Sequence, residues 1–105
     1  QAGAKDFIFV KSDRKNHKIL FSEILYIESV KDYIKIHTTD KRIIVKNTLT
    51  SFEDDLPSNN FIRIHRSYIV NLDFVTAYTS HDIEINSIEI PIGVSYKQKV
   101  FEQLE

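Results

Sequence analysis

The sequence predicts a single, mainly β domain that carries two short helices. Short apolar segments follow one another at close spacing with polar turns between them, and several alternate apolar and polar residues, as half-buried strands do. Only two segments show the helical spacing of apolar residues. The length of 105 residues and the hydrophobic content of 42% suffice for one core. Residues 1–5 are small and polar and are interpreted as a linker remnant, so the predicted domain spans residues 6–105.

The first half of the chain contains five expected strands. Tyr33–Thr38 alternates most clearly, and Arg42–Lys46 is expected to return beside it as a hairpin partner. Charges at both ends of Arg42–Lys46 suit a strand at the edge of a sheet. Residues 11–18 are polar and positively charged and are expected to form a turn. The other expected strands are residues 7–10, 19–21 and 25–29, with a single turn at residues 22–24.

The first helix is expected to begin near Asn47 or Thr48. Leu49, Phe52 and Leu56 then fall at positions i, i+3 and i+7 on one face, and Pro57 ends the helix. Residues 50–53 have the pattern of a capping box, and the acidic residues 53–55 are interpreted as a solvated face.

The second half contains further strands and a closing helix. Residues 61–65 alternate, and a polar break separates them from a strand at 68–70. Residues 74–79 and 83–85 are expected to form a hairpin around residues 80–82, and residues 88–92 a further strand. Tyr96, Val100 and Leu104 recur at four-residue spacing, and Ser95 with Gln98 has the capping-box pattern, so the last helix is expected to begin at Ser95.

The composition excludes several classes of function. Without cysteine, the chain has no disulfides, thiolate metal sites or cysteine nucleophiles, and its two glycines exclude glycine-rich phosphate loops. No apolar segment has the length of a membrane span, so no membrane partner is expected. The four histidines lack metal-ligand spacing, and no catalytic arrangement of residues can be nominated. The sequence therefore predicts no metal, no cofactor and no enzymatic activity.

Charge is distributed unevenly along the chain although the net charge is only −1. Residues 1–46 contain ten Lys and Arg against six Asp and Glu, whereas residues 47–105 contain four against nine. A basic face is therefore possible despite the neutral total. The equally acceptable interpretation is that the two halves intermix in space and cancel.

The most informative segment is FIRIHRSYIVN at residues 61–71. His65 and Arg66 either satisfy backbone carbonyls at the break between two strands, or Arg66 and Ser67 project from the strand end towards a partner. An arginine presents a planar fork that fits guanine or phosphate, and a serine presents a small donor that fits against phosphate. Spacing alone favours neither alternative.

This segment resembles the most diagnostic part of the LytTR-type DNA-binding domains of bacterial two-component response regulators. The strand ending at residues 26–29, the loop leading to Tyr33, the helix around residues 49–56 and the closing residues 90–92 with a helix occur in the family's order. The resemblance implies a compact β-sandwich-like domain of about ten short strands that binds DNA through three loops. Regulation by a sensor histidine kinase, acting on a receiver domain outside this sequence, would promote homodimers on repeated half-sites of double-stranded DNA in the cytoplasm.

Carried over to this sequence, the resemblance implies three groups of contact residues. His65 is interpreted as more structural than DNA-contacting, and Tyr33 either packs in the core or contacts a base. The family often has an arginine before the last helix, where this chain has Val94 and Ser95, so phosphate contact is expected there rather than base reading. The alternative function is a protein-interaction module whose exposed edge, residues 42–46, pairs with a partner strand. The candidate DNA-binding residues are Lys31, Asp32, Tyr33 and Lys35 in the first group, His65, Arg66 and Ser67 in the second, and Ser95, Lys97 and Lys99 in the third.

Overall fold

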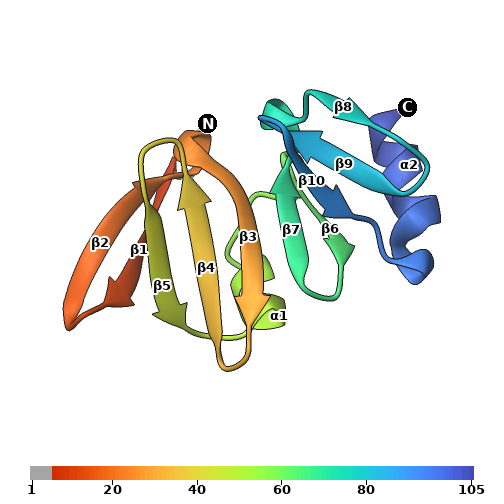
Figure 1. Ribbon diagram of the computed structural model, residues 1–105. Helices are drawn as coiled ribbons and strands as arrows, with labels where there is room; N and C mark the ends of the chain where they lie inside the picture. Colours follow the sequence, from red (N-terminus) through yellow and green to blue (C-terminus); the bar gives the residue numbers. More distant parts are fainter. Residues whose placement is uncertain (1–5) are drawn as a thin grey trace.

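The computed structural model describes residues 6–105, which form ten short strands, two α-helices and three 3₁₀ turns (Figure 1). The predicted linker at residues 1–5 lies outside the described residues. The strands are β1 (Phe7–Ser12), β2 (Lys15–Leu20), β3 (Ile24–Val30), β4 (Tyr33–Thr38), β5 (Arg42–Lys46), β6 (Phe61–His65), β7 (Tyr68–Asn71), β8 (Ala77–Tyr78), β9 (Asp82–Ile85) and β10 (Ile88–Pro91). The helices are α1 (Leu49–Glu53) and α2 (Lys97–Leu104), and the 3₁₀ turns lie at Phe21–Glu23, Leu72–Phe74 and Val94–Tyr96.

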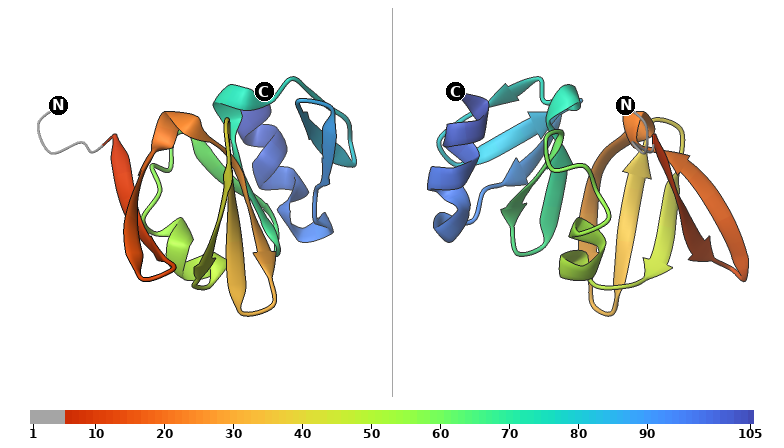
Figure 2. Two further views of the ribbon diagram at one scale, coloured as in Figure 1. Left: turned by 60° about the vertical axis from the view of Figure 1, so that its left-hand side comes forward. Right: turned by 180° about the vertical axis from the view of Figure 1, so that it is seen from behind.

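A five-stranded antiparallel sheet in the order β5-β4-β3-β7-β6 forms the centre of the molecule. The β1–β2 hairpin lies beyond β5, and a three-stranded sheet in the order β10-β9-β8 lies with α2 beyond β6 and β7 (Figures 1 and 2). Strand β3 pairs with both β4 and β7 and so joins the two ends of the central sheet.

Two apolar clusters lie on opposite faces of the central sheet. Ile27 and Ile34 pack with Leu49 and Phe52 of α1 and with the β1–β2 hairpin. Tyr26 packs on the other face in the second cluster, because successive side chains of a strand point to opposite faces. That cluster further contains Ile62, Ile64, Val70, Ile83, Ile85, Ile90, Ile92 and Val100. The mainly β, sandwich-like fold with about ten strands and two short helices is thus confirmed.

The predicted turn at residues 11–18 is wrong over most of its length. Only Asp13 and Arg14 form a turn, while Ser12 pairs with Lys15 and the strands continue on both sides. Both turn residues have positive φ, 53° and 64°. This mirror-image conformation matches the twist of the flanking strands, so a two-residue turn connects them. One side of this two-stranded ribbon faces solvent, so the strands near the turn are rich in polar residues. Their polarity indicated a longer loop.

Two other segments differ from the prediction because side-chain caps determine where a helical turn begins. Residues 74–79 are not one strand: a 3₁₀ turn covers Leu72–Phe74, where the Asn71 side chain accepts a hydrogen bond from the Asp73 amide at 3.0 Å. Helix α1 is capped by Thr48, whose Oγ1 accepts from the Ser51 amide at 3.1 Å, and the predicted capping box at residues 50–53 lies inside the helix. The helix ends at Glu53, so the buried Leu56 lies outside it.

Strands β4, β5 and β6 have the bounds that alternation predicts, and β5 is an edge strand of the central sheet as its terminal charges indicate. The edge is not bare, however. The β1–β2 hairpin lies along it, and Ser12 Oγ donates a hydrogen bond to the Ile44 carbonyl at 2.7 Å. The exposed edge that the alternative function requires is therefore partly covered.

Candidate nucleic-acid interface

The three candidate loops lie at one end of the molecule, along the lower rim in Figure 1. The first connects β3 to β4 at Lys31 and Asp32, the second connects β6 to β7 at Arg66 and Ser67, and the third runs from residue 92 to α2. Backbone hydrogen bonds join their supporting strands. The Ser29 amide donates to the Ser67 carbonyl at 2.8 Å, and the Gly93 amide donates to the Ile64 carbonyl at 2.8 Å.

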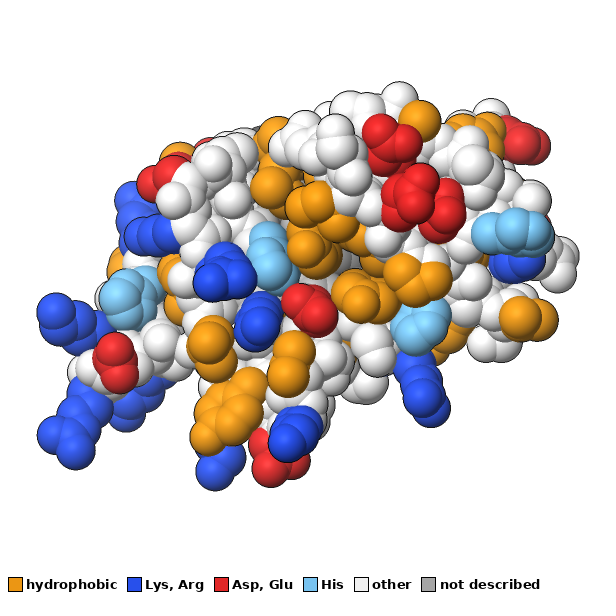
Figure 3. Space-filling model, in the orientation of Figure 1, with side chains coloured by type: hydrophobic (Ala, Val, Ile, Leu, Met, Phe, Trp, Pro, Cys, Tyr) orange, Lys and Arg blue, Asp and Glu red, His pale blue; other side chains and the backbone are white. Residues whose placement is uncertain are grey.

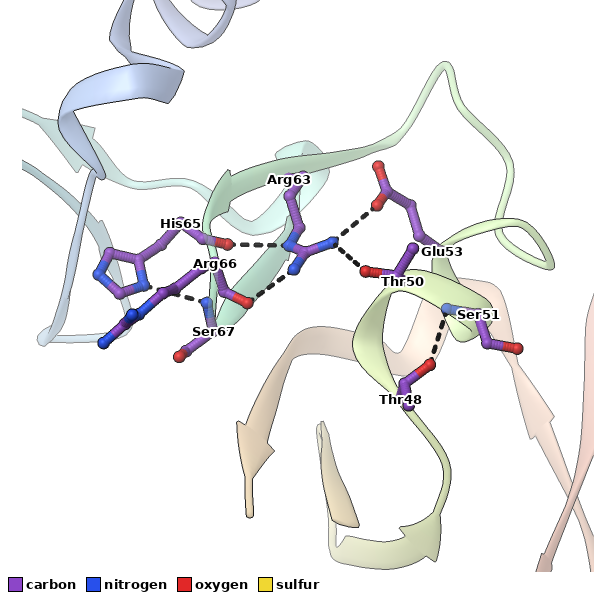
Figure 4. Close-up of polar contacts among 8 residues, drawn as sticks. All are labelled: Thr48, Thr50, Ser51, Glu53, Arg63, His65, Arg66 and Ser67. Carbon is purple, nitrogen blue, oxygen red and sulfur yellow. Dashed lines mark hydrogen bonds and ion pairs between the residues drawn. The ribbon is translucent and has the colours of Figure 1, made fainter. Parts of the chain in front are cut away.

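Arg63 lies between the second loop and α1 and holds the loop in place (Figure 4). Its Nε donates to the His65 carbonyl at 2.9 Å and its Nη2 to the Arg66 carbonyl at 2.6 Å. On the other side its Nη1 pairs with Glu53 Oε1 of α1 at 3.0 Å. One guanidinium therefore connects α1 to two consecutive carbonyls of the loop, and Glu53 is not merely part of a solvated face as the acidic run had indicated.

His65 has the structural role that the sequence favoured. Its Nδ1 accepts a hydrogen bond from the Ser67 amide at 3.0 Å across the turn. The ring also packs against Tyr68, with centroids 5.4 Å apart, and against Gly93 of the third loop. A Cβ at position 93 would lie 3.5 Å from the His65 Cα and 3.0 Å from a ring carbon of Tyr96, so glycine permits this close approach.

Arg66 is exposed, and within the described chain its guanidinium makes no hydrogen bond or ion pair. Its backbone carbonyl, by contrast, is fixed by Arg63. The first of the two alternatives, in which His65 and Arg66 satisfy backbone carbonyls, is therefore wrong in its residues: Arg63 satisfies the carbonyls, and His65 accepts from a backbone amide instead. The second describes Arg66, whose charged side chain projects from a backbone held in place (Figure 4).

The first loop is a tight turn whose exposed residues point away from the core. Lys31 has a φ of 56°, and both Lys31 and Asp32 are exposed. Tyr33, which the sequence placed either in the core or at a base, is 45% exposed and is not a core residue. Lys35 is half-buried further along β4, where it lies opposite Ile44 of β5.

A compact polar cluster supports the β3–β4 hairpin behind the first loop. The His37 ring stacks on Tyr26 with centroids 4.2 Å apart, and His37 Nε2 lies 3.1 Å from Glu28 Oε1. Burial raises the pKa of the Tyr26 hydroxyl, and the neighbouring charge of Glu28 raises it further.

The third loop differs in detail from the prediction. Ser95 does not cap a helix, because a 3₁₀ turn spans Val94–Tyr96 and α2 begins only at Lys97. The helix N-terminus that the sequence placed at Ser95 therefore lies two residues later. The loop instead presents an exposed Ser95 hydroxyl beside Val94, whose side chain is 86% exposed.

The two lysines of α2 lie on different sides. Lys97 Nζ is 3.4 Å from His81 Nδ1, in the turn between β8 and β9. Lys99 is exposed and lines a cleft of about 270 Å³ together with Glu53, Arg63 and Tyr96. Of these two lysines, only Lys99 thus lies beside Arg63 and Glu53, which support the second loop.

Sequence reasoning missed Arg63 as a functional residue. It occupies a polar position in an alternating strand, which is typical of a solvent-facing side chain, and no local pattern links it to Glu53 ten residues earlier. Within residues 6–105 no group of three or more His, Asp or Glu side chains is placed to hold a metal ion. No helix of that part of the chain has the length and apolar character needed to cross a membrane.

Comparisons with known proteins agree with this geometry. The family model described as the LytTr DNA-binding domain matches residues 14–105. The transcriptional regulatory protein LytR of Staphylococcus aureus is 31% identical over 93 residues, covering 83% of this chain and 38% of the relative. The sensory transduction protein LytT of Bacillus subtilis is 34% identical over 84 residues, covering 74% and 35%, and NatR of the same organism, a transcriptional regulatory protein, is 29% identical over 82 residues, covering 75% and 35%.

The solved structures include one with the same arrangement of elements. The LytTr DNA-binding domain of a putative methyl-accepting/DNA response regulator from Bacillus cereus superposes with a TM-score of 0.82 at 25% identity and covers 96% of this chain and 98% of that one. The chain spans a little over a third of the length of the regulators named above. The family match over residues 14–105 and the shared fold show that the chain belongs to the LytTR family of DNA-binding domains.

Proposed function

We propose that residues 6–105 form the sequence-specific output domain of a bacterial two-component response regulator, and that the three loops contact the grooves and phosphates of double-stranded DNA. The observation that carries the proposal is the state of Arg66. Its backbone is fixed by Arg63, while its guanidinium is exposed and free of partners within the described chain. An arginine fork that projects from a fixed backbone suits a base edge in a major groove.

The remaining candidate residues divide by their position on the rim. Arg66 reads a base together with one side chain of the first loop, either Asp32 or Tyr33. Lys31, Ser67, Ser95 and Lys99 contact phosphates, which set the register of the domain on the duplex. Lys35, His65 and Lys97 lie further from the loop tips. They contact DNA through backbone atoms, support the loops, or contact phosphates at the margin of the interface.

The place of the domain in a longer regulator follows from its relatives. The relatives from Bacillus subtilis and Staphylococcus aureus are described as transcriptional regulatory or sensory transduction proteins, and the chain matches only about a third of their length. The similar solved domain is described as part of a putative response regulator. A cytoplasmic regulator fits this pattern, in which a sensor histidine kinase phosphorylates a receiver domain and thereby promotes homodimers on two repeated half-sites. Binding, rather than turnover, is then the activity of residues 6–105.

Selection from a random duplex pool tests the proposal directly. The chain is expected to enrich one motif, and binding to the enriched duplex should weaken with salt by roughly 0.9 in log K per log salt for every phosphate contacted. Binding that is absent even at low salt would contradict the proposal. That outcome would favour the alternative, in which a partner strand pairs with the part of β5 that the hairpin leaves open.

Replacing Arg66 by alanine separates base reading from phosphate contact. If Arg66 reads a base, Arg66→Ala should weaken binding to the enriched duplex by about 1 to 3 kcal/mol and relax the preference at one base pair. Binding to unrelated duplexes should change far less. Because the side chain is exposed and makes no hydrogen bond or ion pair within the described chain, the thermal stability should stay unchanged. An equal loss on all duplexes would assign the residue to a phosphate instead.

A further inference from the structure

A fourth turn lies on the same end of the molecule as the three loops. The β1–β2 turn at Asp13 and Arg14 continues the row formed by the β3–β4 turn, the β6–β7 turn and the connection from β10 to α2, and all views agree on this (Figures 1 and 2). The row places the β1–β2 turn next to the first loop and farthest from the third. Neither the sequence pattern nor the resemblance pointed to this turn, because residues 11–18 read as an ordinary polar connection.

The turn is fixed rather than loosely attached. Its two-residue, positive-φ conformation determines where both side chains begin. Ser12 Oγ ties the base of the turn to the Ile44 carbonyl of β5 at 2.7 Å, and the His17 Nε2 lies 3.2 Å from the Ser12 carbonyl. The side chains at this corner therefore project from a rigid part of the fold.

Four exposed cations, here called the hairpin cations, surround this corner: Lys11, Arg14, Lys15 and Lys46. Among residues 6–105 none of the four forms an ion pair. Lys11 and Lys46 line a shallow groove of about 610 Å³ between the hairpin and β5, in which Asp13 is the only acidic residue. Figure 3 shows Lys and Arg side chains gathered over this side of the molecule.

The groove is continuous with the candidate interface. Tyr33, which follows the first loop directly, lines the groove as well, and it lies opposite Lys46 in the pairing of β4 with β5. A duplex lying along the three loops would therefore meet the hairpin cations if it extended beyond the first loop. Cations without acidic partners on a continuous rim complement a phosphodiester backbone.

We propose that the hairpin cations bind phosphates of the same DNA duplex, outside the base pairs that the loops contact and on the side of the first loop. This inference rests on the proposed function and adds a fourth contact to it. The contact carries affinity and register but no base preference, because phosphates are the same at every step of the sequence.

A matched pair of double variants tests the contact by charge. Arg14→Gln/Lys15→Gln removes two hairpin cations. Lys18→Gln/Lys41→Gln removes two exposed cations away from the row of loops: Lys41 lines the same groove but at its opposite end, in the β4–β5 turn, and Lys18 lies further along β2. On the enriched duplex at 0.15 M salt, the first variant should lose about fivefold in affinity for each phosphate contact, and its salt slope should fall by about 0.9 per contact. The control should keep the affinity and slope of the unchanged chain.

Shortening the duplex gives an independent test with the unchanged protein. Removing base pairs beyond the motif on the side of the first loop should lower affinity for the unchanged chain, whereas the Arg14→Gln/Lys15→Gln variant should be insensitive. Removing them on the side of the third loop should affect both proteins alike. Equal losses for the two double variants, or equal sensitivity of both proteins to shortening on the first-loop side, would overturn the inference while leaving the proposed function intact. Failure of the unchanged chain to bind any duplex would overturn the proposed function itself.

Discussion

Arg63 and Arg66 are three residues apart and have opposite roles. The guanidinium of Arg63 is engaged within the protein: it donates to the carbonyls of His65 and Arg66 and pairs with the carboxylate of Glu53. Arg66 is left free by the same contacts. One arginine thus fixes the backbone from which the other projects, and this division of roles supports the proposal that the second loop contacts DNA.

Replacing Arg63 by lysine tests its positioning role. An ammonium cannot reach two carbonyls and a carboxylate in the geometry of the planar fork, so Arg63→Lys should lower the free energy of unfolding by about 1 to 3 kcal/mol. It should also weaken the base preference at the position read by Arg66, although Arg66 is unchanged. Chemical denaturation and binding to the enriched and scrambled duplexes measure the two effects.

Glu53→Gln is the control for Arg63. The amide oxygen can still accept from Arg63 Nη1, so the fork should stay in place and both effects should be smaller than those of Arg63→Lys. A merely structural arginine would change stability without changing the ratio of specific to non-specific binding. That outcome would contradict the positioning role.

The contrast between these two arginines also shows what the sequence can predict at the scale of single residues. The segment around His65 and Arg66 was identified as the candidate site, and the buttressing role of His65 was favoured from its place at a strand break. The pairing of Arg63 with Glu53 was not predictable, because it depends on where α1 packs on the central sheet, against β3 and β7, which no local spacing encodes.

Strand β3 is the element on which the arrangement of the first and second loops depends. It pairs with β4 on one side and with β7 on the other, and its side chains enter both apolar clusters. Tyr26 lies at its centre, is 8% exposed and stacks on His37 of β4. A charge on Tyr26 would therefore form in the interior of the sheet.

The raised pKa of Tyr26 predicts a loss of stability in alkaline solution. The unfolded chain releases the tyrosine proton near the ordinary value of about 10, whereas the folded chain holds it to higher pH. The folded state then binds more protons than the unfolded state, so the free energy of unfolding falls as the pH rises above about 10. Tyr26→Phe should reduce this fall, as urea denaturation at pH 8 and pH 11 can measure. A fall of the same size in Tyr26→Phe would show that other groups cause it.

Prediction succeeded for elements with strong alternation and failed where the signal was weak. Strands β4, β5 and β6 alternate clearly, and their bounds agree with the structure. The β1–β2 hairpin is largely polar at its tip, so its strands resembled a turn. The start of α2 was misplaced because Ser95 has the sequence of a cap but lies in a 3₁₀ turn. At the start of that turn Gly93 lies against His65 and donates to the Ile64 carbonyl, and these tertiary contacts are not visible in the local sequence.

At the scale of the whole molecule, the uneven distribution of charged residues along the sequence is also seen on the surface of the folded protein. Basic side chains lie over the β1–β2 hairpin and β5, and acidic side chains gather over the β8–β10 sheet (Figure 3). On the face that Figure 3 shows, basic and acidic side chains are therefore separated although the net charge is only −1, as the interpretation with a basic face expects. A polarised domain approaches an anionic duplex with its basic side first, which favours an orientation before any specific contact forms.

The acidic side contains a pair of like charges that does not stabilise the sheet. Glu84 of β9 and Glu89 of β10 lie directly opposite each other in the strand pairing, and Glu89 is exposed. Like charges in this position destabilise a sheet, and opposite charges stabilise it by about 0.2 to 1 kcal/mol. Glu89→Lys should therefore raise the free energy of unfolding.

The same substitution tests whether the acidic sheet keeps DNA away from this side. Glu89→Lys should increase binding to scrambled duplexes at low salt, where the field of the domain reaches far, and the increase should vanish near 0.15 M salt, where the Debye length is about 8 Å. The enriched motif should stay the same, because the loops that read it are unchanged. A change of the preferred motif would mean that the β8–β10 sheet contacts bases, so that part of the interface lies outside the row of loops. An unchanged affinity for scrambled duplexes at every salt concentration would show that the acidic side has no part in orienting the domain.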